Sequence, residues 1–453
     1  MTAEARNQCL VDASGTTAAC AMTAPGTGDP TMGAAGRWRW HYRWIVVAVS
    51  ATVNALAWGA RSTFALFYVA LLEEFPWGRG PTAAGYSLSW LCFVVCAPVA
   101  GWLSDRWGAR IVVPIGGLVL GAALALTGQV TSLWQYYLVF GALSAAGIAG
   151  MVVPATTVVT RWFVRSRGTA MGVLSAGSSS SALVFYPINA WLIVRLGWRT
   201  ALVAFGLLVA SATVALAVLL YRNPPPNDDR VGQADAADRT AAGTMAPARE
   251  PWTLPRALCS ARLWAACTMT ALGVIGYQIL ATHQVAHAVD GGFAPATVVW
   301  LFAVGGGCMT AGNLLGGWLS DQYGRGWVFA LGTGVVLAGI GCLAVINGPQ
   351  DLPLLVLYTV SGLGFGMRIA QLSAIPADVF AGRHLGAILG VVQAGGGLGG
   401  AIGPFLGGWL FDMTGSYGWA FLAAGIAVTG SAVAAWVAAR PTQAWPARRG
   451  AVS

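Results

Sequence analysis

Apolar residues occur along the chain in twelve stretches, each long enough to form a membrane-spanning helix. A helix of about 20 apolar residues crosses the roughly 30 Å of hydrocarbon in a bilayer. Lipid offers the backbone no hydrogen-bond partners, so an apolar run of this length predicts a helix that satisfies its own backbone. The predicted spans are 44–72, 82–103, 110–129, 133–159, 169–193, 199–221, 263–288, 295–318, 327–346, 353–378, 385–409 and 418–439.

Polar sequence divides these spans into two groups of six. The dividing segment begins with Arg222-Asn223-Pro224-Pro225-Pro226 and is charged and rich in turn-forming residues, which is typical of a linker. The predicted parts are a tail at 1–43, a bundle at 44–221, a linker at 222–262, a bundle at 263–439 and a tail at 440–453.

A repeated motif links the two groups. Gly101-Trp102-Leu103-Ser104-Asp105 follows the second span, and Gly317-Trp318-Leu319-Ser320-Asp321 follows the eighth. Both copies occupy the same place in their half. Duplication about a central linker is typical of secondary carriers, which place the substrate site between the halves. The sequence thus predicts an all-α membrane protein of two pseudo-symmetric six-helix bundles.

Composition supports the membrane assignment and limits the partners. The chain is 57% hydrophobic and 9% charged, whereas soluble domains carry about 25% charge. Its net charge of +9 comes from arginine, since the chain has no lysine. These arginines gather before the first span and in short loops two spans apart, which indicates positive-inside orientation rather than nucleic-acid binding. We therefore expect a plasma-membrane protein with both termini cytoplasmic.

Enzyme and metal motifs are not found in the sequence. We find no Walker loop, nucleophile elbow, HExxH motif or CxxC pair. The expected partners are the lipid bilayer and a small solute, without cofactor or metal, and the expected functional unit is a monomer.

The loop after the second span resembles the signature of the major facilitator superfamily. It reads Gly101-x-Leu103-Ser104-Asp105-Arg106-x-Gly108-Ala109-Arg110, one residue longer than the superfamily pattern before its last arginine. The resemblance implies the twelve-helix major facilitator fold and a gating role for this loop, in which Asp105 bonds to a neighbouring helix end or pairs with Arg110. Simple topogenic charge is the alternative. The predicted gating residues are Gly101, Asp105, Arg106, Arg110, Asp321, Arg325 and Asp378.

Three further stretches are similar to the monocarboxylate transporter and oxalate/formate antiporter branch. The first is residues 59–68 with Glu74-Phe75-Pro76-Trp77. The second is Arg161-Trp162-Phe163 with residues 167–172 and 197–199. The third is Gly403-Pro404 with residues 407–417. This resemblance implies transport of a small organic anion.

An arginine within the first span is the first candidate for binding that anion. Ser50, Asn54, Arg61 and Tyr68 recur at spacings of four and seven, and so share one helical face. Ionisable groups inside spans are costly and usually functional. Monocarboxylate transporters carry a basic residue at the matching position. The alternative is that Arg61 snorkels to the outer interface.

A second arginine lies deep in the tenth span. By spacing, Tyr358, Ser361, Arg368 and Gln371 share a face. A guanidinium there can bind a carboxylate through two parallel hydrogen bonds, although a structural pair with Asp378 or helix-end carbonyls is the alternative. The eighth span, 295–318, lacks the charges of the resembled family. The substrate-binding prediction comprises Arg61, Arg368, Asn54, Tyr68, Tyr358, Gln371, Tyr277, Gln278 and Gln393.

Proton coupling has no evident acceptor in the sequence. His283 and His287 are four residues apart near the predicted outer end of the seventh span, where interfacial hydration is the alternative. The proton-coupling candidates are His283, His287 and Asp378. The predicted function is alternating-access transport of a small organic anion, a monocarboxylate, with proton symport. The alternative is efflux of drugs or amphipathic metabolites.

Overall fold

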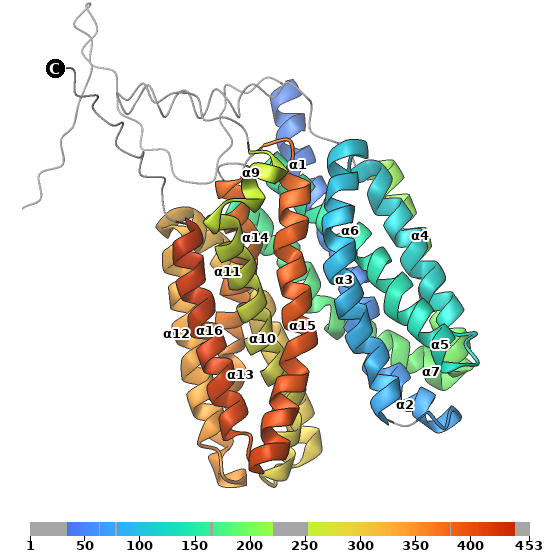
Figure 1. Cartoon of the computed structure of the whole chain (residues 1–453), viewed down its shortest axis with the longest axis vertical. Helices are drawn as coiled ribbons and strands as arrows, with labels where there is room; N and C mark the ends of the chain where they lie inside the picture. The colour runs from blue at the N-terminus through green and yellow to red at the C-terminus, as the bar shows by residue number, and fades with distance from the viewer. Residues whose placement is uncertain are drawn as a thin grey trace, which may run out of the picture. The chain divides into compact units, whose positions relative to one another are not determined.

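A computed structural model describes residues 34–62, 64–77, 79–163, 166–220, 252–380 and 382–439. Residues 1–33, 221–251 and 440–453 lie outside the described residues, and they include much of the predicted N-terminal tail, most of the predicted linker and all of the predicted C-terminal tail. The described part is helical and contains no strand (Figure 1).

The helices fall into two halves along the chain. The first half comprises α1 (Ala34–Ser62), α2 (Phe64–Glu74), α3 (Arg79–Trp107), α4 (Ala109–Thr127), α5 (Leu133–Tyr136), η1 (Tyr137–Leu143), α6 (Ser144–Trp162) and α7 (Arg167–Leu220). The second half comprises α9 (Leu254–Leu258), α10 (Ala261–Asp290), α11 (Pro295–Tyr323), α12 (Arg325–Ala344), η2 (Pro349–Asp351), α13 (Leu352–Val360), α14 (Gly362–Val379), α15 (Leu385–Thr414) and α16 (Gly418–Ala439).

The helices account for the twelve predicted crossings. By length and composition, ten helical stretches among the described residues can cross a membrane. One of them is α7, which Gly197 (φ 76°, ψ 157°) divides into two crossings. The 29-residue α11 covers the span predicted at 295–318 and supplies the remaining one. The all-α fold with twelve crossings is therefore confirmed.

Two predicted spans are each covered by two helices. The span predicted at 44–72 is covered by α1, which begins at Ala34, and by α2, and Thr63 between them lies outside the described residues. The span at 353–378 is divided at Ser361 between α13 and α14. Glycine disfavours helix, and it occurs at 362, 364 and 366, while the Ser361 hydroxyl donates back to the Tyr358 carbonyl at 2.6 Å. The region predicted as linker, 222–262, contains α9 and the first residues of α10.

Within residues 43–439 the helices form two bundles. In the first, α4 packs on α6 and α7; in the second, α10 packs on α15 and α16, and α11 on α14. The bundles meet where α3 packs along α15 and α7 along α11. Glycine allows this close approach: a Cβ at Gly101 would overlap the Gly386 carbonyl, and one at Gly317 would overlap the Gly168 carbonyl.

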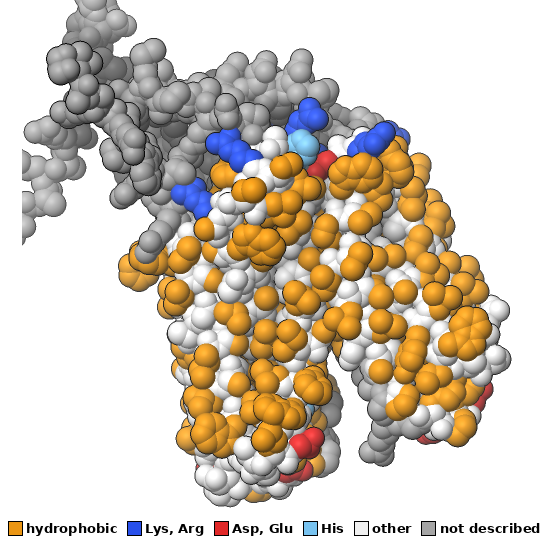
Figure 2. All heavy atoms as spheres, viewed as in Figure 1, with side chains coloured by type: hydrophobic (Ala, Val, Ile, Leu, Met, Phe, Trp, Pro, Cys, Tyr) orange, Lys and Arg blue, Asp and Glu red, His pale blue; other side chains and the backbone are white. Residues whose placement is uncertain are grey.

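The two ends of the paired bundles differ. We call the end near α9 the linker end and the opposite end the far end. Figure 2 shows a cleft between the bundles that opens at the far end, whereas the arginines visible on this face gather at the linker end. Large apolar side chains cover the outer surface between the ends, as expected of a lipid-facing belt. The most exposed include Val194, Trp300, Trp327 and Phe405.

Candidate functional site

A cavity of about 490 Å³ lies between the two bundles. Both bundles line it, with residues from α1, α3, α6 and α7 on one side and from α10, α11, α13, α14 and α15 on the other. Its polar lining includes Asn54, Arg61, Ser175, Ser178, Gln278, Gln284, Tyr358 and Gln393. This is the position expected of a substrate site in a carrier built from two halves.

Arg61 is the single charged side chain among the described residues that line the cavity. It is 4% exposed, so it does not snorkel to a membrane interface. Its Cζ lies 3.8 Å from the centroid of the Trp90 ring, and its Nη2 donates to the Ser89 hydroxyl at 3.2 Å. Its Nε and Nη1 have no hydrogen-bond partner in the described part of the chain. A buried cation with free donors and no acidic neighbour in the cavity wall is suited to an anionic ligand.

The polar face predicted for the first span is only partly directed at the cavity. Asn54 lies two turns before Arg61 on α1, lines the cavity and donates to the Ser178 hydroxyl at 3.0 Å. Tyr68 does not line it: it lies on α2, and its ring centroid is 5.5 Å from that of Phe64.

Arg368 lies outside the cavity. It is 3% exposed, its Nη2 donates to the Val428 carbonyl of α16 at 3.2 Å, and its Cζ lies 4.8 Å from the Phe329 ring centroid of α12. Gln371 also faces away and donates to the Gly316 carbonyl at 3.2 Å. The cavity-facing stripe continues from Tyr358 through Phe365, Ile369 and Leu372, and by ordinary helical spacing Arg368 and Gln371 fall to one side of it. The shared face predicted for these residues is therefore not observed.

The other predicted binding residues do line the cavity. Tyr277 and Gln278 come from α10, Tyr358 from α13 and Gln393 from α15. The Tyr358 hydroxyl donates to Gln284 Oε1 at 2.5 Å. Gln393 Nε2 is buried without a partner among the described residues. The second bundle thus contributes neutral polar groups and no charge to the described cavity wall.

The two histidines contact main-chain carbonyls rather than the cavity. A ring nitrogen of His283 lies 3.1 Å from the Pro404 carbonyl oxygen, and one of His287 lies 3.0 Å from that of Leu343. Both rings also pack near Tyr417. Within the described ranges, no group of three His, Cys, Asp or Glu side chains is arranged to hold a metal.

Asp105 connects the first bundle to the second at the linker end. Its carboxylate accepts hydrogen bonds from the main-chain N–H groups of Gly386 and Ala387, at 2.9 and 2.8 Å, in the first turn of α15. A carboxylate there also complements the helix dipole. The cation paired with it is Arg161, at 2.6 Å. The predicted partner, Arg110, is exposed, as is Arg106.

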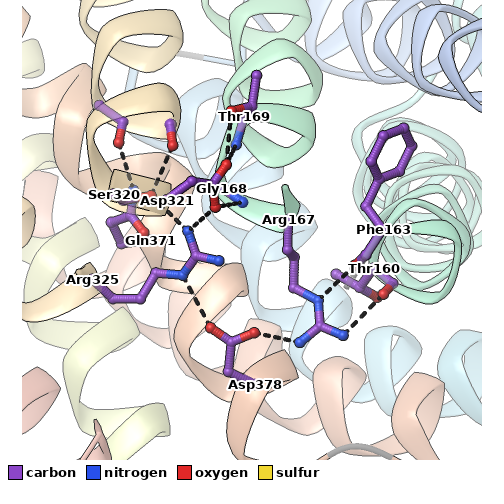
Figure 3. Close-up of polar contacts among 12 residues, drawn as sticks. Thr160, Phe163, Arg167, Gly168, Thr169, Ser320, Asp321, Arg325, Gln371 and Asp378 are labelled. Atoms are coloured by element: carbon purple, nitrogen blue, oxygen red, sulfur yellow. Dashed lines mark hydrogen bonds and ion pairs between the residues drawn. The ribbon is translucent and has the colours of Figure 1, made fainter. Parts of the chain in front are cut away.

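Asp321 makes the matching connection in the opposite direction. It accepts hydrogen bonds from the main-chain N–H groups of Gly168 and Thr169, at 2.8 and 2.7 Å, in the first turn of α7 (Figure 3). Arg325 donates to the same carboxylate at 2.8 Å. The sequence repeat therefore corresponds to a repeated contact between the bundles.

Asp378 bridges two arginines beside this contact. It pairs with Arg325 at 3.0 Å and with Arg167 in a close ion pair (Figure 3). Arg167 also donates to the Phe163 and Thr160 carbonyls, at 3.0 and 3.2 Å. The predicted gating residues did not include Arg161 and Arg167, although both belong to a stretch that is similar to the monocarboxylate transporters. Their position just before the fifth predicted span was the available indication.

Fold and cavity together define a polytopic membrane carrier, and the comparisons agree. The Major Facilitator Superfamily model matches residues 47–307 and 288–451. The chain is 30% identical to human monocarboxylate transporter 11 over 426 residues, covering 89% of this chain and 83% of that protein. It is 26% identical to rat monocarboxylate transporter 12, covering 91% and 87%. A crystal structure of the transporter FucP in the outward conformation aligns with a TM-score of 0.67 at 12% identity, covering 88% of this chain and 100% of FucP. The chain belongs to the Major Facilitator Superfamily and is related to the monocarboxylate transporters; it is a transporter and not an enzyme.

Proposed function

We propose that this protein is a secondary active transporter that moves a small organic anion, a monocarboxylate, across the plasma membrane. The observation that carries the proposal is Arg61: a buried guanidinium with two unpaired donor atoms, in a central cavity whose described wall contains no carboxylate. A guanidinium forms two parallel hydrogen bonds with one carboxylate. The monocarboxylate transporters among the relatives support this substrate class.

Transport proceeds by rocking of the two bundles about this cavity. In the present conformation the cleft opens at the far end, while Asp105 and Asp321 hold the linker end together. Release on the other side requires those contacts to break. The concentration of arginine at the linker end favours a cytoplasmic location for that end and for both termini. The transporting unit is a monomer, since each chain has both bundles.

A coupled proton would offset the cost of carrying a negative charge across the bilayer. Since the described cavity wall has no carboxylate, the substrate carboxylate itself is the nearest group to share that proton. His283, His287 and Asp378 remain the protein's candidates, each outside the cavity lining. The missing cavity carboxylate also disfavours efflux of cationic drugs.

Purified protein in liposomes tests this function. We expect saturable uptake of labelled monocarboxylates that is stimulated by an inwardly directed proton gradient and inhibited by other monocarboxylates, with no uptake in empty liposomes. Uptake of cationic amphiphiles, without uptake of any carboxylate of the panel, would contradict the proposal.

A further inference from the structure

The charges around the cavity limit its solute to one negative charge. Arg61 is the sole charged group in the described lining, and Arg368, the other buried arginine considered as a ligand, contacts Phe329 and Val428 instead. A second carboxylate on the solute would find no cation, and an ammonium group would find no anion. Either unpaired charge becomes costly when the rocking bundles close the site off from water. The wall therefore selects against dicarboxylates and zwitterionic amino acids.

Four fully buried hydrogen-bond donors of the lining residues have no partner in the described part of the chain. They are Nε and Nη1 of Arg61, Nε1 of Trp90 and Nε2 of Gln393. Arg61 and Trp90 stack on one another in the first bundle, whereas Gln393 belongs to α15 in the second. Among the fully buried atoms of the described lining residues, the one acceptor without a partner is Asn54 Oδ1. A carboxylate, which has only acceptors when ionised, suits this excess of unpaired donors in the two bundles.

Rings line the rest of the cavity from both sides. Trp58, Trp90 and Phe93 come from the first bundle, and Tyr277, Phe302 and Phe365 from the second. Tyr277 and Phe365 form an edge-to-face pair with centroids 5.5 Å apart. Cavities of roughly 300–1,000 Å³ bury ligands the size of a drug molecule, and this one measures about 490 Å³. A two- or three-carbon acid would leave most of these rings without contact.

We propose that the preferred solute is a monocarboxylate with a neutral aromatic or bulky apolar body, bound with its carboxylate on Arg61 and its ring among the aromatic side chains of both bundles. This inference rests on the proposed function and narrows its substrate class. It separates the solute from short-chain acids by size, and from amino acids and dicarboxylates by charge.

Four matched compounds test the inference in liposomes containing the full chain. The reference is 3-phenylpropionate; propionate removes the ring, phenylalanine adds an ammonium group, and phenylsuccinate adds a carboxylate. Loss of the ring removes a large apolar contact, so we expect KM to be at least about tenfold lower for 3-phenylpropionate than for propionate. Phenylalanine and phenylsuccinate should compete at least about tenfold more weakly, because each brings an unpaired charge.

The outcomes separate this inference from the proposed function. Transport of propionate as good as or better than that of 3-phenylpropionate overturns the inference and leaves anion transport standing. Equal competition by phenylalanine or phenylsuccinate also overturns it. Transport of none of the carboxylates overturns the proposed function itself.

A pair of phenylalanine variants assigns the effect to the cavity. Phe365→Ala removes a cavity ring and should raise KM for 3-phenylpropionate several-fold more than KM for propionate. Phe405→Ala removes a ring that is 72% exposed on the outer surface of α15 and should change neither. Parallel changes for both substrates in Phe365→Ala, with the variant eluting as a monodisperse protein, would contradict ring recognition.

Discussion

Asp105 and Asp321 make the same contact from opposite bundles: each accepts main-chain hydrogen bonds from the first turn of a helix in the other bundle. Charge-assisted bonds of this kind contribute about 1.5–3 kcal/mol each. The linker end is therefore held closed by two equivalent carboxylates. Opening the linker end exposes four main-chain N–H groups, of which Asp105 and Asp321 now accept hydrogen bonds from two each.

Replacing Asp105 by alanine should loosen the first turn of α15. The variant loses two main-chain bonds and the ion pair with Arg161, so we expect the closed linker end to be destabilised by at least about 3 kcal/mol, or on the order of a hundredfold in protection. Hydrogen exchange at residues 385–390, followed by mass spectrometry, measures this. Asp412→Ala, at the exposed far end of the same helix, is the control and should leave these amides unchanged. Unaltered exchange in Asp105→Ala would show that the carboxylate does not hold the bundles together.

A methyl group at Gly101 should prevent the linker end from closing. Its Cβ would overlap the Gly386 carbonyl, a main-chain atom that cannot move without shifting α15. We expect Gly101→Ala to lose most net uptake while remaining folded. Gly326→Ala is the matched control, since a Cβ there meets nothing within 4 Å. Wild-type uptake by Gly101→Ala would mean that α3 and α15 need not approach so closely.

Neutralising Asp378 should weaken gating rather than proton coupling. Asp378→Asn leaves Arg167, which is 6% exposed, without its carboxylate, and loosens Arg325. A buried cation deprived of its partner typically costs about 3–5 kcal/mol, so the thermal midpoint should fall and net uptake should decrease. The remaining uptake should still respond to a proton gradient. Substrate exchange at the wild-type rate, together with loss of that response, would instead identify Asp378 as the proton acceptor.

Arg368 should matter for stability and not for binding. Its guanidinium is buried; within the described ranges Nε has no hydrogen-bond partner, and Nη2 donates to the Val428 carbonyl. Replacing a poorly satisfied buried charge by an apolar side chain is often neutral or stabilising by about 1–4 kcal/mol. Arg368→Met should therefore unfold at an equal or higher temperature and bind substrate within about threefold of wild type. Loss of binding by a folded Arg368→Met would return this arginine to the substrate site.

Local patterns in the sequence predicted the helices and the repeated contact motif well. Apolar length determines a membrane span, and the two Gly-Trp-Leu-Ser-Asp copies indicated equivalent carboxylates in the two halves. The face presented by Arg368 could not be predicted, because spacing shows which residues share a helical face but not which face a neighbouring helix covers, and α16 and α12 cover Arg368. Nor could spacing show that Arg161 pairs with Asp105, 56 positions away, since that pairing depends on how separate helices pack.

Binding of a carried monocarboxylate to Arg61 variants decides whether this guanidinium holds the anion. Isothermal titration of purified protein should show that Arg61→Gln loses about a hundredfold in affinity, since removing one member of a buried charge pair costs about 2–5 kcal/mol. Arg61→Lys should retain part of the affinity, because it keeps the charge but lacks the planar fork. Wild-type affinity in a correctly folded Arg61→Gln would contradict the claim that this guanidinium holds the anion.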